Sequence, residues 1–173
     1  MTELVDLYNV DRELLGARIP RNTGIPEGKY ILIVHICIFS RAGEMLIQKR
    51  TEEKAIWPGY WDLSAGGAAC AGESSREAAE RETFEELGIR LPFDAKRPVI
   101  TVNFARGFDD IYTLDHEPDI DELNIQTDEL SEVKWASYDD ICTLIDSGKF
   151  IPYEKELIQY LFVAREGRGS WNL

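Results

Sequence analysis

Three glutamates, Glu82, Glu85 and Glu86, stand at spacings i, i+3 and i+4 within residues 67–89, GAACAGESSREAAERETFEELGI. On an α-helix these spacings place the side chains on one face, where like charges destabilise the helix by roughly 0.2–0.5 kcal/mol per pair. No lysine or arginine lies between them on that face. Hard divalent cations prefer oxygen ligands, so the pattern predicts a helix that binds Mg²⁺ or Mn²⁺. The plainer alternative is a solvated acidic surface.

Capping signals define where this helix begins and ends. Ser74 and Glu77 predict a capping box at its start, and Gly88 is a residue type that commonly ends helices. A mostly apolar stripe repeats every four residues, at Ala79, Thr83 and Leu87. We therefore expect the stripe to pack inward and the acidic face to point away from the packed face. Gly66 and Gly67 predict a turn whose backbone can approach a ligand closely.

Apolar segments and turn residues alternate along the rest of the chain. Strands are predicted at residues 4–8, 13–19, 30–40, 44–50, 99–107, 110–116 and 132–137, with a short strand after the Pro58-Gly59 turn. Two further helices are predicted at 139–146 and 153–166. Segments 30–40 and 44–50 are expected to form a hairpin in the middle of a sheet. Strands mixed with a few helices favour an α/β fold, layered as an α/β/α sandwich.

The length of 173 residues favours a single domain with a sizeable core. Within that domain, 1–173, we expect residues 1–28 to form an N-terminal strand and loop extension. Residues 167–173 are expected to be a loose C-terminal tail. The N-terminal strands offer a possible surface for a homodimer.

The charge balance restricts the partners of the chain. Its formal net charge is −13, which argues against polymeric nucleic acid and against an anionic membrane surface. No segment is apolar enough for a signal peptide or a membrane span. The three cysteines, Cys37, Cys70 and Cys142, have no paired spacing and are expected to be reduced thiols. These features predict a cytoplasmic protein that acts on a small molecule.

The spacing of the residues around the acidic cluster resembles the signature of the Nudix hydrolases. The matching positions are Gly67, Glu73, Arg81, Glu82, Glu85, Glu86, Gly88 and Ile89. One position departs, because Thr83 stands where the family usually has a bulky aliphatic residue. The resemblance implies a Nudix α/β/α sandwich with a mixed β-sheet. It also implies metal-dependent hydrolysis of a diphosphate linkage in a nucleoside diphosphate derivative or a related small compound.

The resemblance also assigns roles within the motif. Glu82, Glu85 and Glu86 would bind the cation, and the carbonyl of Gly67 would add a backbone oxygen. Glu73 and Arg81 would pair with each other and brace the loop and helix, and Gly88 would end the helix. Such a cation would reverse the local negative charge, polarise phosphoryl oxygens and lower the pKa of bound water.

Outside the motif, Glu129 lies six residues before Trp135, where a family glutamate often serves as a metal ligand or general base. Asp128 and Glu132 are neighbouring candidates, and a solvated loop acid is the plain alternative. Arg50 and Lys54 precede the Trp57-Pro58-Gly59 turn and are candidates for substrate binding through its phosphates.

A rival function from another class is that of the isopentenyl diphosphate isomerases, which share the fold. These enzymes need a cysteine and a histidine in the loop before the helix. In this chain the corresponding positions are Gly66 and Ala68, which have no suitable side chain. A non-catalytic nucleotide-binding module is a third possibility, although such modules usually lose one or more helix glutamates.

The identity of the substrate is left open by the sequence. Candidates for stacking on a base are Tyr60, Phe104, Phe108 and Tyr112, although large aromatic residues more often pack in a core. We expect Trp57, Trp61 and Trp135 to serve in packing.

Overall fold

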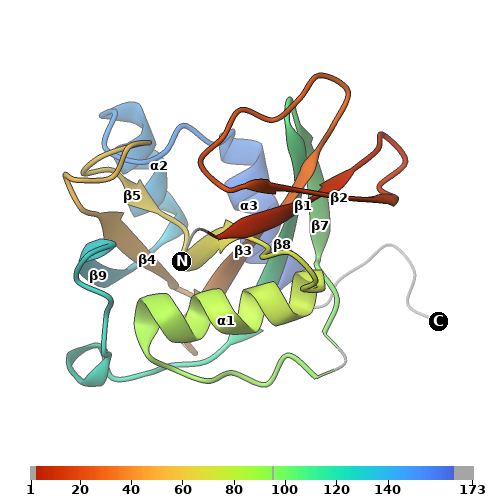
Figure 1. Cartoon of the computed structure of the whole chain (residues 1–173). Helices are drawn as coiled ribbons and strands as arrows, with labels where there is room; N and C mark the ends of the chain where they lie inside the picture. Colours follow the sequence, from red (N-terminus) through yellow and green to blue (C-terminus); the bar gives the residue numbers. More distant parts are fainter. Residues whose placement is uncertain (1–2, 95, 166–173) are drawn as a thin grey trace.

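The computed structural model describes residues 3–94 and 96–165, so the predicted C-terminal tail at 167–173 lies outside the described residues. The strands are β1 (Leu4–Tyr8), β2 (Leu14–Pro20), β3 (Ile31–Phe39), β4 (Met45–Arg50), β5 (Trp61–Asp62), β6 (Ala65–Ala68), β7 (Ile100–Phe104), β8 (Gly107–Asp115) and β9 (Leu130–Ala136). The helices are α1 (Ser75–Leu87), α2 (Tyr138–Asp146) and α3 (Lys155–Ala164), with a 3₁₀ turn at Ile120–Glu122. These elements follow the predicted order along the chain (Figure 1). Two differences lie before α1: β5 and β6 stand where one short strand was predicted, and the predicted turn at Gly66 and Gly67 is part of β6, which pairs with β3.

Strands β3 to β9 form one mixed sheet. Its main path is β5-β4-β3-β8-β7, with β6 also paired to β3 and β9 to β4. Strands β3 and β8 run parallel along their whole lengths, and the other pairs are antiparallel. The predicted break at 108–109 lies instead at 105–106, because Gly107 already pairs with Phe104 across the turn.

The hairpin predicted from 30–40 and 44–50 exists only at its tip. Strands β3 and β4 pair at Phe39 and Met45 alone. Beyond that point β3 pairs with β6, and β4 pairs with β5 and β9. The two halves of the sheet therefore diverge, and this divergence leaves room for a pocket between them.

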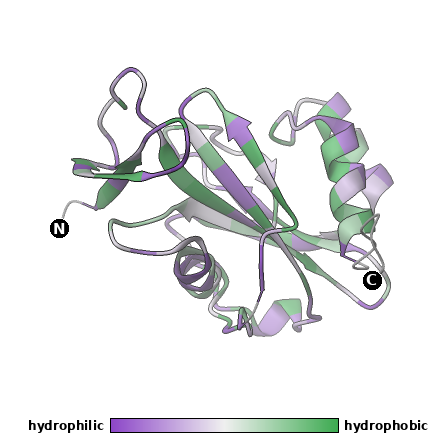
Figure 2. Ribbon diagram, turned by 90° about the vertical axis from the view of Figure 1, so that its right-hand side faces the viewer, coloured by the Kyte–Doolittle hydropathy of each residue, from purple (hydrophilic) through white to green (hydrophobic). Residues whose placement is uncertain are grey.

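Alternation along β3 explains the layers on the two faces of the sheet (Figure 2). Val34, Ile36 and Ile38 belong to a core cluster that includes Ala78 and Leu87 of α1. A second cluster contains residues of α2 and α3 together with Cys37 and Phe39. Because successive side chains of a strand point to opposite faces, one apolar strand serves both cores. The predicted α/β/α sandwich with a mixed β-sheet is confirmed.

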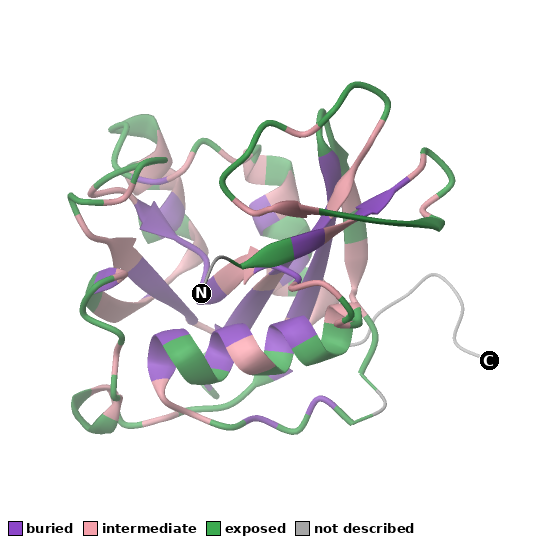
Figure 3. Cartoon of the chain, in the orientation of Figure 1, coloured by how far each residue is buried: buried purple, intermediate pink, exposed green. Residues whose placement is uncertain are grey.

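Helix α1 has the predicted capping box between Ser74 and Glu77, and Gly88 ends it in the left-handed conformation at φ 73°. The prediction that its acidic face points away from the packed face is wrong. Glu82 and Glu86 are only 5% and 2% exposed, whereas residues on the outer face are open to solvent (Figure 3). A stripe of small residues lets α1 approach β6 closely, so two of the three carboxylates turn inward.

The N-terminal strands form a separate two-stranded sheet that lies over the start of β3 (Figure 1). Tyr8 bridges to Tyr30, and Arg12 forms an ion pair with the buried carboxylate of Asp110 on β8. The Gly72 N–H donates to Asp6, which ties this hairpin to the loop before α1. These contacts hold the N-terminal segment beside the acidic helix.

Candidate functional site

The glycines of β6 allow α1 to bring its carboxylates against the sheet. A Cβ atom at Gly67 would overlap the carboxylate of Glu82, and one at Gly66 would overlap the ring of His35. The Gly66 N–H donates to Glu86 Oε2 at 3.0 Å. Glycine is therefore required at position 66, where the Val34 carbonyl is also too close for a Cβ, whereas a Cβ at position 67 would displace the Glu82 carboxylate.

Arg81 holds the loop and the helix together. Its Nε lies 2.7 Å from Glu73 Oε1, so the pairing of these two residues that the resemblance implies is present. Its Nη2 donates to the carbonyl of Ala68 at 3.0 Å. Its Nη1 lies 2.9 Å from both Glu82 Oε1 and Glu85 Oε2. No lysine or arginine lies between the three glutamates on their own face, but Arg81 reaches two of them from the adjoining face.

The buried carboxylates are electrostatically unfavourable without further positive charge. Burial, followed by the charge of Glu82, raises the pKa of Glu86 to about 8. Burial also raises the pKa of Glu82, although Arg81 opposes the shift. A cation beside the cluster would favour both ionised forms. The donor set, which consists of carboxylate oxygens, therefore suits a hard divalent ion.

Arg81 nevertheless occupies oxygens that such an ion would need. In residues 3–94 and 96–165, no three His, Cys, Asp or Glu side chains are already gathered in positions to hold a metal. Binding would require the carboxylates of Glu82 and Glu85 to turn from the guanidinium toward the ion. Glu85 is on the exposed side of α1 and has room to do so.

The loop before β9 brings Glu129 to the same place. Glu129, Glu82 and Glu85 line one pocket of about 350 Å³, together with Glu3, Arg21 and Gln126. Lys54 Nζ lies 2.5 Å from Glu129 Oε2. The neighbouring candidates Asp128 and Glu132 do not line this pocket.

A second pocket of about 360 Å³ adjoins the first and shares Arg21 and Glu129 with it. Arg50 and Lys54 both line this second pocket. Arg50 Nε donates to the Ile56 carbonyl at 3.1 Å, which orients its guanidinium. The structure therefore brings the predicted basic residues and Glu129 beside the acidic helix.

Arg21 is a basic residue that sequence reasoning missed. It follows β2, and an ion pair of 2.7 Å with Glu3 holds its side chain beside the acidic pocket. Burial opposes the charge of Arg21, but Glu3, Glu82 and Glu129 raise its pKa overall. Its position depends on how the N-terminal hairpin packs, so no local pattern indicates it.

The floor of the second pocket holds a polar network that was also missed. His35 Nδ1 lies 2.9 Å from both oxygens of Asp109, and Tyr153 Oη lies 3.3 Å from His35 Nε2 and 3.0 Å from Asp62 Oδ1. Burial lowers the pKa of His35, but Asp109 outweighs it and raises that pKa to about 9. Burial raises the pKa of Asp62 and of Tyr153. A histidine within an apolar strand was the one available signal.

The aromatic candidates separate by burial. Phe108 and Tyr112 are buried in the core, so they are not available for stacking on a base. Trp61 is buried, as expected. The assignment of Trp57 to packing is wrong, because this side chain is 39% exposed and lines the second pocket.

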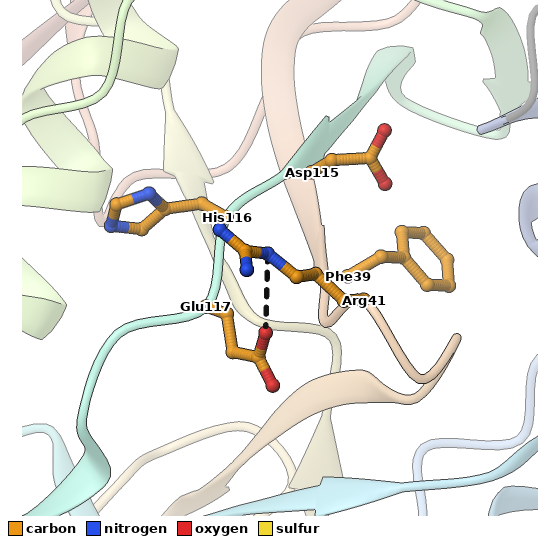
Figure 4. Close-up of a pocket in the computed structure, with 5 residues that line it drawn as sticks. All are labelled: Phe39, Arg41, Asp115, His116 and Glu117. Atoms are coloured by element: carbon orange, nitrogen blue, oxygen red, sulfur yellow. Dashed lines mark ion pairs between the residues drawn. The ribbon is translucent and has the colours of Figure 1, made fainter.

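A further hollow of about 490 Å³ lies at the other end of β3, where β3 and β8 end side by side (Figure 4). Its lining is Phe39, Arg41, Asp115, His116 and Glu117, and Arg41 approaches Glu117 at 3.8 Å. Arg41 is almost fully exposed. None of the predicted site residues lines this hollow, so it is separate from the acidic cluster.

The fold and the acidic loop–helix define a hydrolase of the Nudix type, and comparison with known proteins identifies the family. The NUDIX domain family model matches residues 29–161, and the chain belongs to this family. An uncharacterized Nudix hydrolase of Listeria monocytogenes is 40% identical over 148 residues, which are 86% of this chain and 88% of that protein.

Solved structures show the same fold. DR0079 from Deinococcus radiodurans has a TM-score of 0.76 and 24% identity, covering 92% of this chain and 99% of its own. The NUDIX domain of Shewanella oneidensis NrtR, solved in complex with ADP ribose, has a TM-score of 0.58 and 22% identity, covering 80% and 88%.

Membership of the family establishes the class of activity. The chain is a Nudix pyrophosphohydrolase, and the family hydrolyses nucleoside diphosphate derivatives, generally with divalent metal ions. Nothing in these comparisons supports the isomerase alternative, for which Gly66 and Ala68 also lack the required side chains. Over the described residues, the helices are too short and too polar to span a membrane.

Proposed function

We propose that the chain hydrolyses the diphosphate linkage of a small nucleoside diphosphate derivative, with Mg²⁺ or Mn²⁺ as cofactor. One observation carries the proposal: Glu82, Glu85 and Glu129 line one pocket, with Glu86 buried beside it. The basic residues Arg21, Arg50 and Lys54 lie at the adjoining pocket. Carboxylates that would hold a cation thus lie next to basic side chains that would hold phosphate.

Each side chain has a distinct task in this proposal. Glu82, Glu85 and Glu86 would hold the cation, with the Gly67 carbonyl as a further ligand. When bound, the cation would polarise phosphoryl oxygens and activate water. Arg81 is a positioning residue, since its ion pair with Glu73 and its bond to the Ala68 carbonyl brace the loop against the helix.

Glu129 is the proposed general base, and Lys54 controls its availability. The two side chains form an ion pair of 2.5 Å. A substrate phosphate that attracts Lys54 would free the Glu129 carboxylate to accept the proton of the attacking water. Arg50 and Arg21 would then share the charge of the leaving phosphate. The base would thus be released only when substrate is present.

A panel of nucleoside diphosphate compounds, assayed with Mg²⁺ and with Mn²⁺, tests the function. We expect Glu86→Gln to abolish metal-dependent turnover and Glu129→Gln to reduce kcat by about 10²–10⁴-fold. Glu132→Gln is the matched control, because that exposed residue is close in sequence but does not line the acidic pocket. Unchanged metal-dependent hydrolysis in Glu86→Gln would exclude the proposed role of the cluster.

A further inference from the structure

The second pocket, between the diverging halves of the sheet, has a floor of polar side chains that have no role in the proposed hydrolysis. His35, Asp62 and Tyr153 line it from β3, β5 and the segment before α3. Asp62 is buried, and His35 and Tyr153 are partly buried. Three polar groups from distant parts of the chain thus converge at a pocket that adjoins the acidic cluster.

Hydrogen bonds fix the orientation of the side chains on this floor. A protonated His35 donates from Nδ1 to Asp109 and from Nε2 to the Tyr153 oxygen, and Tyr153 then donates to Asp62 Oδ1 at 3.0 Å. The Leu63 N–H donates to the same Oδ1 at 2.8 Å. This network therefore fixes the plane of the Asp62 carboxylate.

The second oxygen of that carboxylate is left for a ligand. Within the described ranges, no side chain or backbone group donates a hydrogen bond to Asp62 Oδ2, and Arg50 Nη1 approaches it only to 3.8 Å. Among residues 3–94 and 96–165, the one fully buried side-chain atom without a hydrogen bond is Gln48 Oε1, so Asp62 Oδ2 is open to the pocket, where a ligand can donate to it.

The walls of the pocket are suited to a flat ring. They include Ile31, Ile33, Ile56, Trp57 and Ile151. Trp57 has a left-handed backbone, with φ 53°, that is unusual for a bulky residue. Its ring lies 5.1 Å from that of Tyr60, centroid to centroid, and leaves an exposed surface at the pocket. These apolar side chains lie in the same pocket as Arg50, Lys54 and Glu129, so the pocket offers apolar contact area for a ring beside charged groups for the phosphates.

We propose that this pocket selects the substrate by binding a nucleobase with an exocyclic amino group, which donates to Asp62 Oδ2. The inference rests on the proposed function, since the base belongs to the nucleoside whose diphosphate reaches the acidic cluster. Gly67 and Glu129 line the same pocket, which joins the two sites. A purely apolar group would leave Asp62 Oδ2 unpaired and would be disfavoured.

Nucleoside monophosphates that differ at one group test the proposal without requiring hydrolysis. Calorimetry would compare CMP with UMP and AMP with IMP, since each pair exchanges an amino group for a carbonyl. We expect the amino member to bind about 10- to 100-fold more tightly, the range for a hydrogen bond to a charged group. Equal affinities within both pairs, or no measurable binding by any of the four, would overturn the proposal.

Asp62→Asn is the informative variant, because its Oδ1 still accepts from Leu63 and Tyr153 while an amide donor replaces Oδ2. The preference should then disappear or shift to UMP and IMP, and an unchanged ratio would contradict the proposal. Should Asp62→Asn fail to fold, Trp57→Ala replaces it. That variant should weaken CMP and UMP by the same factor, and unaltered binding would count against the pocket.

The outcome is separable from that of the proposed hydrolysis. Loss of turnover in Glu86→Gln with equal binding of CMP and UMP would retain the hydrolase and reject the base pocket. Selective binding by a protein that hydrolyses no diphosphate would retain the pocket and reject the hydrolase.

Discussion

Replacing Glu86 by glutamine should stabilise the protein when no metal is bound. The carboxylate of Glu86 is buried beside Glu82, and its pKa is raised from 4.5 to about 8. Glutamine is close in shape to the protonated carboxyl group and still offers an oxygen to the Gly66 N–H. The substitution therefore removes an unfavourable charge and keeps the hydrogen bond.

The sign of the pH dependence follows from the raised pKa. Unfolded protein releases the Glu86 proton near pH 4.5, whereas folded protein retains it until about pH 8. Between these values unfolding releases a proton, so the free energy of unfolding of the wild type falls as pH rises. The full shift corresponds to about 5 kcal/mol at 1.36 kcal/mol per pKa unit. Structural relaxation and water penetration reduce such penalties, so we expect ~2 kcal/mol in practice.

Thermal denaturation in EDTA at pH 5 and at pH 8 measures this effect. At about 2–4 °C per kcal/mol for a chain of this size, Glu86→Gln should raise Tm by roughly 4–8 °C at pH 8 and by little at pH 5. Added Mg²⁺ should stabilise the wild type more than the variant. Glu85→Gln is the control for burial, because Glu85 lies on the exposed side of α1. A Glu86→Gln protein that is no more stable than wild type at pH 8 would refute the reasoning.

Three other substitutions test neighbouring parts of the site. Arg21→Ala should raise KM about tenfold, because one charged hydrogen bond to phosphate is lost. Arg18→Ala, on the same hairpin, is the control and should leave KM unchanged. An equal rise of KM in both variants would indicate that Arg21 has a structural role. In the wild type, the ion pair of protonated His35 contributes stability that is fully present below pH 6.5 and is lost as pH rises through about 9. His35→Gln removes this contribution, so the free energies of unfolding of variant and wild type should differ more at pH 6 than at pH 9.5. Gly67→Ala should reduce Mg²⁺ affinity and kcat/KM by at least about 100-fold, because its Cβ would displace the Glu82 carboxylate. Retention of wild-type Mg²⁺ affinity would contradict that account.

The elements that sequence predicts well are those with local signals. The capping box of Ser74 and Glu77 and the end of α1 at Gly88 depend on residues within a few positions of one another. The apolar run of β3 indicates a strand buried on both faces, and it serves both cores. The strong periodicity of these segments leaves few alternative structures.

The features that sequence reasoning missed depend on distant parts of the chain. The inward turn of Glu82 and Glu86 requires the close approach of α1 to the glycines of β6. The contact between Tyr153 and Asp62 joins positions 91 residues apart. Neither spacing nor composition shows that Arg21 lies beside the acidic pocket. Such features are set by tertiary packing, which a single sequence indicates only where a motif fixes it.

The arrangement of acids and bases explains why stability and function oppose each other in this site. An exposed carboxylate would be harmless to folding, but water would screen its attraction for a cation. A buried carboxylate such as Glu86 destabilises the free protein, yet the same low polarity strengthens its interaction with bound metal. The ion pair of Lys54 with Glu129 follows the same logic, since each side chain neutralises the other until substrate and cation supply better partners. Binding of substrate and cation would thus release Lys54 and Glu129 from each other. Metal and substrate should therefore bind more tightly together than either does alone.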